Sequence, residues 1–268
     1  MDDFNDDSKL FHPEYAHIFF GDDEQLTGYN EPVITIYINA WSFKVYLNFE
    51  YNQKHKVLPA PDPIALITPY IAKNSIISDL DEFKESIGKD RKLSKPFGNP
   101  ISNYELTNRN TGVSKEYNLY FHKFGTSDEE FDEEFVLFHE NVQFFILLEI
   151  DGGTYIEAKD PRWEVFLLYE KQNIDGTDYQ HLIGYCTAYR FYAFPDSFRL
   201  RISQFLLFPP YQKCGHGRRL LQSIYDNAIS RGARDIPVED PAPEFGRLRG
   251  KYCKIFLYIF IYLLILFN

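Results

Sequence analysis

The sequence has few of the residues that mark secreted, metal-binding or nucleic-acid-binding proteins. Its 3 cysteines in 268 residues are odd in number and lack CxxC spacing, so we expect reduced thiols in an intracellular protein, not a disulfide framework or zinc site. The histidines, including His12, His17 and His139, lack ligand spacing, and no metal is expected. Lys and Arg number 28 against 39 Asp and Glu, a formal charge of −11. This balance argues against direct nucleic-acid binding and favours a basic partner.

Other familiar signals are also missing. There is no GxxxxGK[ST] loop and no GxGxxG followed by an acid about 20 residues later. The first residues, MDDFNDDSK, are acidic where an export signal is basic and then apolar, so no export signal is expected. The apolar run at 255–267 is shorter than the roughly 20 residues that cross a bilayer, so we expect no membrane. Aromatic residues, in contrast, are plentiful: 25 Phe and 20 Tyr can fill a large core.

The spacing of apolar residues predicts a mixed α+β fold. The composition changes near Gly112, which predicts an amino-terminal α+β domain over 1–112 and a second domain over 113–249. Up to residue 104 we expect two strands within 33–49, helical pieces at 64–72 (interrupted at Pro69) and 78–87, and a turn-rich stretch at 95–104. A strand at 117–124 and a helix at 128–148 are expected to follow.

The second half predicts an antiparallel meander followed by a turn and a helix. Strand patterns at 163–172, 181–194 and 199–208 are joined by short turns. The stretch YQKCGHGRRLLQSIYD (211–226) then begins a helix with apolar residues at Leu220, Leu221, Ile224 and Ala228. A short strand follows at 236–240 and ends in Glu239 and Asp240.

The glycine turn at 212–218 has the features of an anion site. Unpaired N–H groups and the helix dipole favour an anion at a helix start, and Gly215 and Gly217 let the backbone approach a phosphate without a Cβ in the way. Lys213, Arg218 and Arg219 add positive charge in an acidic chain. Alone the pattern is weak because glycine is common. A meander before it and a strand ending in acid after it make it more specific.

This arrangement resembles the acetyl-CoA site of the GCN5-related N-acetyltransferase superfamily. A set of motifs in consistent order, from about Phe11 to Arg249, is similar to the catalytic subunit of type B histone acetyltransferases. The motifs are GDDE (21–24), KPFG (95–98), RW (162–163), GYCTAYRFYAFPD (184–196), SQFLLFPPYQKCGHG (203–217) and VEDP (238–241).

The resemblance implies acetyl-CoA as cosubstrate and assigns residues to it. The residues expected to wrap its pyrophosphate are Gln212, Lys213, Cys214, Gly215, His216, Gly217 and Arg218. Phe205, Leu206 and Leu207 would offer main-chain groups to the pantetheine arm and the acetyl carbonyl. Lys213 and Cys214 stand where the family has small or neutral residues, a departure expected to lower cofactor affinity while both glycines remain.

Glu239 matches the family's general base, with Asp240 beside it. A lysine amine has a pKa of about 10.4, so its deprotonation near pH 7 costs roughly 4.6 kcal/mol, and a carboxylate that accepts the proton is valuable. Asp151, at the end of the acidic helix, is a second candidate base. Without the resemblance, Glu239 and Asp240 would be an ordinary acidic strand end.

By the same resemblance, a basic histone tail is the substrate. Residues expected to contact it are Asp22, Asp23, Glu24, Trp163, Tyr189, Arg190 and Phe191. The plain alternatives are a polar turn at 21–24 and a core role for Trp163. A WD40 histone chaperone subunit is the partner that the resemblance implies, and the nucleus and cytoplasm are the implied locations.

After Arg249 the resemblance stops at GKYCKIFLYIFIYLLILFN. Gly-Lys-Tyr can be encoded GGT-AAG-TAT, an intron donor sequence, so we expect that the tail is unspliced intron and that the acetyltransferase domain is truncated. Two alternatives stay open beside an acetyltransferase acting on the histone-four tail. One is an inactive histone-binding fragment, and the other is an acetyltransferase for a different amine.

Overall fold

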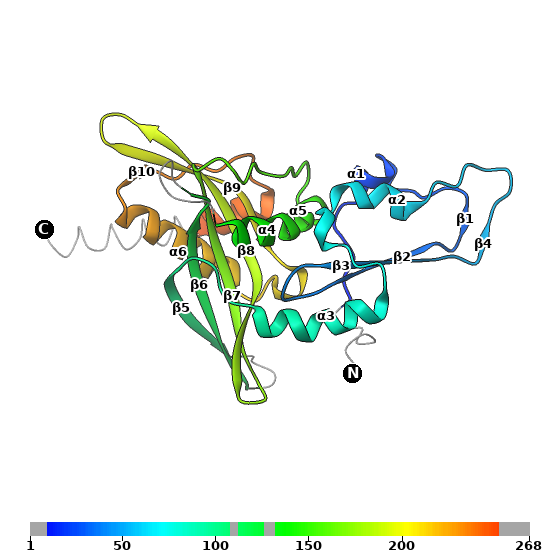
Figure 1. The fold of residues 1–268 in the computed structure, drawn as a ribbon. Coiled ribbons are helices and arrows are strands. Elements are labelled where there is room, and N and C mark those ends of the chain that lie inside the picture. The colour runs from blue at the N-terminus through cyan, green and yellow to red at the C-terminus, as the bar shows by residue number, and fades with distance from the viewer. Residues whose placement is uncertain (1–9, 108–111, 126–131, 252–268) are drawn as a thin grey trace, which may run out of the picture. The chain divides into compact units, whose positions relative to one another are not determined.

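The computed structural model describes residues 10–107, 112–125 and 132–251. The chain divides into two compact units, each assembled from several stretches. Unit 1 comprises 1–96, 124–160 and 171–182, and unit 2 comprises 97–123, 161–170 and 183–268. Both mix helices and strands, which confirms the expected α+β class (Figure 1). The domain boundary near Gly112 stays a prediction.

The amino-terminal elements of unit 1 follow the predicted pattern. Strands β2 (Val33–Ile38) and β3 (Val45–Glu50) pair antiparallel, as expected. Helix α2 (Pro63–Ile67) gives way to a 3₁₀ turn at Thr68–Tyr70, where Pro69 removes a backbone donor. Helix α3 (Leu80–Leu93) begins where the Asp79 carboxylate accepts a hydrogen bond from the Glu82 N–H. Short elements complete this part: α1 (His17–Phe20), β1 (Tyr29–Asn30), β4 (Gln53–Lys54) and a 3₁₀ turn at Lys73–Ser75.

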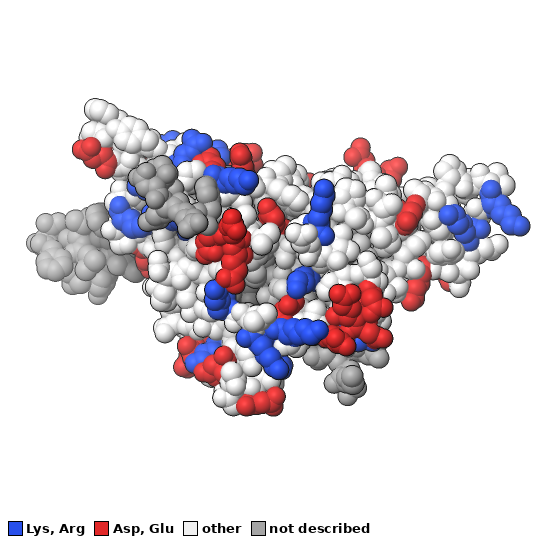
Figure 2. Space-filling model, in the orientation of Figure 1, with Lys and Arg blue, Asp and Glu red and all other residues white. Residues whose placement is uncertain are grey.

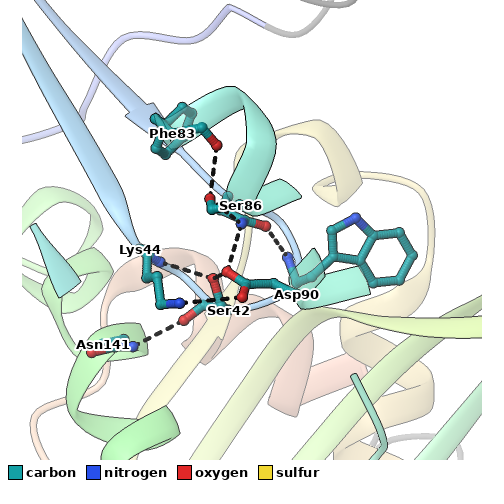
Figure 3. Close-up of polar contacts among 8 residues, drawn as sticks. Ser42, Lys44, Phe83, Ser86, Asp90 and Asn141 are labelled. Atoms are coloured by element: carbon teal, nitrogen blue, oxygen red, sulfur yellow. Dashed lines mark hydrogen bonds and ion pairs between the residues drawn. The ribbon is translucent and has the colours of Figure 1, made fainter. Parts of the chain in front are cut away.

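A polar cluster fixes the turn between β2 and β3 to α3 (Figure 3). The Asp90 carboxylate accepts hydrogen bonds from Ser42 Oγ at 2.6 Å and Asn39 Nδ2 at 3.0 Å, and Lys44 Nζ lies 3.2 Å from it. Asn141 Nδ2 donates to the Ser42 carbonyl at 3.0 Å. Asn39 is 1% exposed, so these bonds satisfy polar groups that would otherwise be costly to bury.

The predicted helix at 128–148 is two helices, α4 (Glu133–Val142) and α5 (Phe144–Glu149). Residues 128–131 lie outside the described residues. The two helices meet at Gln143, whose side-chain oxygen accepts a hydrogen bond from the Ile156 N–H at 2.8 Å. Phe144, Leu147 and Leu148 of α5 pack with Phe19 and Val45 in the core of unit 1.

A six-stranded sheet, with strand order β10-β9-β8-β7-β6-β5, forms most of unit 2. Strands β5 (Asn99–Thr107) and β6 (Ser114–Lys123) pair antiparallel, β6 pairs antiparallel with β7 (Trp163–Ile174), and β8 (Thr177–Ala193) pairs antiparallel with β9 (Ser197–Leu207). Strand β8 lies beside β7, and the hairpin end of both strands belongs to unit 1. The predicted meander is therefore confirmed.

Strand β5 corrects one prediction. The stretch 95–104 was expected to be turn-rich, yet β5 begins at Asn99. Pro100 is tolerated because β5 is at the edge of the sheet, and the pairing is irregular between Pro100 and Ser102. Gly98 adopts a φ of 84° beside β6, where a Cβ would come within 2.4 Å of the Phe121 carbonyl oxygen. The glycine and proline here mark the start of an edge strand.

Helix α6 (His216–Ser230) packs on this sheet and buries the apolar face that the sequence predicted. Leu220, Leu221, Ile224 and Ala228 are each 0% exposed and share a core with residues of β8 and β9. Strand β10 (Ala233–Asp235) then pairs parallel with β9 and is the terminal strand of the described sheet. A helical segment at 243–251 follows.

Acidic and basic side chains are intermingled on the face that Figure 2 shows. In the described part of the chain, we find no helix long and apolar enough to cross a membrane. Nor do three or more His, Cys, Asp or Glu side chains gather there in a way that could hold a metal ion.

Candidate functional site

The glycine turn lies at the start of α6 and is open to solvent. A 3₁₀ turn at Pro209–Tyr211 leads into it, and two of its residues adopt left-handed backbone, Lys213 with φ 58° and Gly215 with φ 96°. Gly215 is the N-cap residue of α6, where an added Cβ would meet no described atom within 4 Å. The glycine therefore serves the backbone conformation and leaves the amides of the first turn uncovered.

These features suit an anion. The first N–H groups of α6 point out of the helix start, and the exposed side chains of Lys213 and Arg218 add positive charge. Gln212 Nε2 donates to the Leu207 carbonyl at 3.0 Å, which ties the beginning of the turn to the end of β9. The residues present therefore fit the diphosphate group that the sequence analysis predicted.

His216 contributes differently from its neighbours. Its ring is buried, its Nδ1 lies 2.7 Å from Tyr104 Oη, and it contacts the Tyr117 ring edge-on at 4.5 Å between centroids. Burial lowers the pKa of the His216 imidazole below its ordinary value. Because the ring points into the core, only the main chain of His216 is available to a ligand at the turn.

The end of β9 has main-chain groups that face away from β8 beside the turn. Phe208 N–H donates to the Ile183 carbonyl of β8, and backbone direction alternates along a strand, so Leu206 also faces β8 while Phe205 and Leu207 face away. On that far side the bonds of the 236–240 segment reach β9 only as far as Ile202 among the described residues. Of the three predicted residues, Phe205 thus turns its main-chain groups away from β8, Leu207 turns its N–H that way while its carbonyl accepts from Gln212, and Leu206 faces β8.

Glu239 lies beside the middle of β9. Its N–H donates to the Ile202 carbonyl at 2.9 Å, and Ile202 pairs in parallel with Val238. Ser203 Oγ donates to Glu239 Oε2 at 2.6 Å, and an Arg201 guanidinium nitrogen lies 3.1 Å from Oε1. Asp240 is exposed, and the chain turns there with a left-handed φ of 31°. The predicted strand at 236–240 is thus a short bridged segment, and the paired strand β10 comes just before it.

Three of the predicted substrate residues share one face of the sheet next to Glu239. The Trp163 and Tyr189 rings meet edge-on at 4.8 Å, and Tyr189 and Phe191 lie 4.7 Å apart. We call Trp163, Tyr189 and Phe191 the aromatic strip. Arg201 lies over Phe191 at 5.0 Å, so one side chain contacts both the aromatic strip and Glu239. Trp163 is half-buried and not a core residue.

Arg190 is not part of this strip. It pairs across from Leu200 and lies over Phe198 at 4.3 Å, and Phe198 belongs to the core beneath α6. Successive side chains of a strand point to opposite faces, so Arg190 lies on the face opposite to Tyr189 and Phe191.

Two residues of the site were not predicted. Arg201 pairs across from Tyr189 and so shares the face of the aromatic strip, and Ser203 follows at the irregular step of the β8–β9 pairing. The alternation of apolar and basic residues over 198–202 was a signal for Arg201 present in the sequence. The contact of Arg201 and Ser203 with Glu239, 36 residues or more further along the chain, was not.

The predicted acids of the amino-terminal part lie in unit 1. Asp22 and Asp23 are exposed, whereas Glu24 is used within its own turn, where Oε1 accepts hydrogen bonds from the Ala16 and His17 N–H groups at 2.7 and 2.9 Å. These bonds, the one from Ala16 first, hold the pKa of the Glu24 carboxyl below its ordinary value. Asp151 is exposed and follows α5 directly, also in unit 1.

Comparison with known proteins agrees with this arrangement. Residues 1–151 match the family described as "Histone acetyl transferase HAT1 N-terminus", and residues 117–242 match "Acetyltransferase (GNAT) family". A type B histone acetyltransferase catalytic subunit of Dictyostelium discoideum is 36% identical over 250 residues, which are 90% of this chain and 49% of the relative. The mouse catalytic subunit is 32% identical, over 94% of this chain and 61% of its own length.

A glycine turn between an antiparallel meander and α6, together with the match over 117–242, defines a protein of the GCN5-related N-acetyltransferase superfamily, whose members use acetyl-CoA. The amino-terminal match covers more than half of the 268 residues. The chain therefore belongs to the family of type B histone acetyltransferase catalytic subunits, and it spans about half to three fifths of the length of these relatives. The predicted family is confirmed.

Proposed function

We propose that the chain is an acetyl-CoA-dependent lysine acetyltransferase that modifies newly made core histone, with the histone-four tail as its target. One observation supports this most strongly: Glu239 and the glycine turn are both attached to β9, at Ile202 and Leu207. A strand rises about 3.3 Å per residue, so these two points lie about 17 Å apart. That separation leaves room for an extended thioester arm between an anion site and a base.

The residues would divide the binding of acetyl-CoA between them. The turn at 212–218 would hold the diphosphate with main-chain N–H groups and with the side chains of Lys213 and Arg218. The outward main-chain groups of Phe205 and Leu207 would pair with the pantetheine arm, and one of these N–H groups would stabilise the carbonyl oxygen during acyl transfer. Acetyl-CoA supplies the acetyl thioester.

Glu239 would act as the general base. It takes a proton from the lysine ammonium, and the free amine then forms the amide bond while the C–S bond breaks. The leaving thiolate takes up one proton to give coenzyme A. The ammonium loses two protons in all, so the reaction releases one H⁺ to solvent. Asp240 stands beside the base. Cys214 belongs to the turn at the other end of β9, so the acetyl group passes directly to the amine without a covalent enzyme intermediate.

The substrate is proposed from charge and family. A formal charge of −11 attracts a basic, unfolded tail, and the aromatic strip beside Glu239 offers apolar surface to the lysine stem. Exposed Asp22 and Asp23 would add acidic contacts. As in its relatives' family, we propose a WD40 histone chaperone subunit as the partner and action in both nucleus and cytoplasm.

A thiol-labelling experiment tests the cofactor site. Cys214 is exposed and Cys186 is buried, and burial also raises the pKa of the Cys186 thiol, so alkylation of a Cys253→Ser variant should modify Cys214 alone. Saturating acetyl-CoA should slow this alkylation at least fivefold, measured by mass spectrometry. Cys214→Ser in the same Cys253→Ser background is the control and should remain unlabelled. Equal rates with and without acetyl-CoA would remove the turn from the cofactor site.

Replacement of Glu239 tests the chemistry. Glu239→Gln should lower kcat about 100-fold or more at pH 7, the usual range for loss of a general base, and less at pH 9.5, where more lysine is already neutral. Binding of acetyl-CoA, measured by calorimetry, should not change. Acetyl-CoA binding without any turnover by the unmodified chain would instead favour an inactive histone-binding protein.

A further inference from the structure

The Glu239 carboxylate is held on both oxygens by side chains of β9. Ser203 Oγ donates to Oε2 at 2.6 Å, a distance typical of a strong hydrogen bond to a charged acceptor, and Arg201 approaches Oε1 at 3.1 Å. A carboxylate bound at one oxygen can rotate about its Cγ–Cδ bond. The hydrogen bond on one oxygen and the ion pair on the other restrict this rotation.

The backbone of β9 is adapted to place these donors. Gln204 pairs with Thr187 and Ile202 pairs with the next residue, Ala188, so Ser203 is the extra residue of a bulge. A bulge re-aims side chains and frees backbone from pairing. Arg201 is fixed independently, because its guanidinium lies over the Phe191 ring at 5.0 Å. Both donors are therefore constrained before they meet Glu239.

We infer that Arg201 and Ser203 are positioning residues that orient Glu239 toward the target lysine. This inference rests on the proposed function. A carboxylate has about four lone-pair sites, and the Ser203 hydroxyl occupies one of them, which leaves sites for the lysine proton beside the Arg201 ion pair. In the transfer, an N–H bond of the ammonium breaks and an O–H bond forms on Glu239, while Arg201 and Ser203 keep their own protons. Arg201 also contacts the Phe191 ring. A substrate that binds to the aromatic strip would therefore also affect the position of Arg201, and through Arg201 the orientation of Glu239.

The same contacts could have a purely structural role and hold the 236–240 segment on β9. The two roles differ in what they change. If the role is structural, replacing Arg201 or Ser203 lowers stability and acetyl-CoA binding, by the same amount whether residue 239 is Glu or Gln. If the role is positioning, the replacement lowers kcat, and it does so only while Glu239 is present to act as the base.

Matched pairs of variants in the full chain separate these roles. Ser203→Ala should lower kcat on a basic histone-tail peptide about tenfold, with KM for acetyl-CoA and the midpoint of urea unfolding little changed. Ser203→Thr keeps the hydroxyl and should stay within about threefold of the unmodified chain. Arg201→Met should lose a similar factor, and Arg201→Lys should recover part of it.

A double-mutant cycle gives the decisive result. In the Glu239→Gln background, Ser203→Ala should lower kcat by less than twofold, since there is no base left to orient. Equal losses in the two backgrounds, or full activity of Ser203→Ala with an active Glu239, would overturn the positioning role and leave the proposed function standing. Full activity of Glu239→Gln at pH 7, or a chain without any transferase activity, would overturn the proposed base and this inference with it.

Discussion

His216 begins α6, yet its imidazole lies inside the core of unit 2, with Nδ1 2.7 Å from Tyr104 Oη and the Tyr117 ring against its edge. The residue therefore ties the glycine turn to the core of unit 2. Desolvation disfavours the charged ring, which explains the lowered pKa.

This burial makes the stability of the protein dependent on pH. The unfolded chain takes up a proton on His216 at about pH 6.5, and the folded protein does so only at lower pH, so acidification below about 6.5 favours unfolding. His216→Gln should lack this contribution. Urea unfolding at pH 7.5 and 5.5 should therefore show a larger loss of free energy for the unmodified chain than for the variant. An identical pH dependence would mean that His216 does not titrate abnormally.

Single residues also show what the sequence could predict about the site. Gly215 and the buried face of α6 follow from local patterns, and the structure has both. The inward turn of His216 and the contacts of Arg201 and Ser203 with Glu239 do not follow, because they depend on partners more than 30 residues away. The roles assigned to Glu239, to the turn and to the aromatic strip remain predictions.

At the scale of elements, α6 is anchored at its end as well as along its face. The Arg231 guanidinium, just after α6, donates to both Glu164 oxygens of β7 at 2.8 and 2.6 Å and lies over the Phe121 ring at 4.4 Å. The Glu164 side chain is 2% exposed. A carboxylate buried to this degree is stable only with its partner.

Loss of one partner should therefore destabilise unit 2. Arg231→Met should lower the free energy of unfolding by about 3 kcal/mol, because it leaves Glu164 buried without its counter-ion. Replacing both, with Glu164→Leu added, should recover most of that loss. Exposed Arg234 provides the matched control, since Arg234→Met should change stability by less than about 0.5 kcal/mol. Urea titration measures all three, and an additive double variant would contradict the argument.

Elements with strong periodicity were predictable, and those shaped by their neighbours were not. The meander β7–β9 follows from strand patterns joined by short turns and α6 follows from apolar spacing, whereas α3 was predicted only in part because it continues from the expected end at 87 to Leu93. Strand β5 was missed because Gly98 and Pro100 are typical of a turn. Their place at the start of a strand depends on pairing with β6, which the local sequence does not show. The break between α4 and α5 depends on the bond that Gln143 makes to Ile156, which the helical pattern of 128–148 does not contain.

At the scale of the whole molecule, the excess of acid over base would favour the basic partner that we propose. Fixed charges attract a basic peptide over roughly 10 Å at 0.1 M salt, and less as salt rises.

Binding of a basic tail should therefore be sensitive to salt. Between 50 and 300 mM NaCl, KM for a histone-tail peptide should rise about five- to tenfold while kcat changes little. A peptide in which all lysines but the target are replaced by glutamine should show a much weaker dependence. If both peptides respond equally, the acidic surface has no part in selecting the substrate.

The two compact units interleave along the chain, since unit 1 includes 171–182 and unit 2 begins at 97. A ribosome therefore releases most of unit 1 long before the stretch that completes it, and synthesis has passed well into unit 2 by then. Neither unit can be expressed alone by cutting the gene at one point, because each is assembled from separate stretches of the chain.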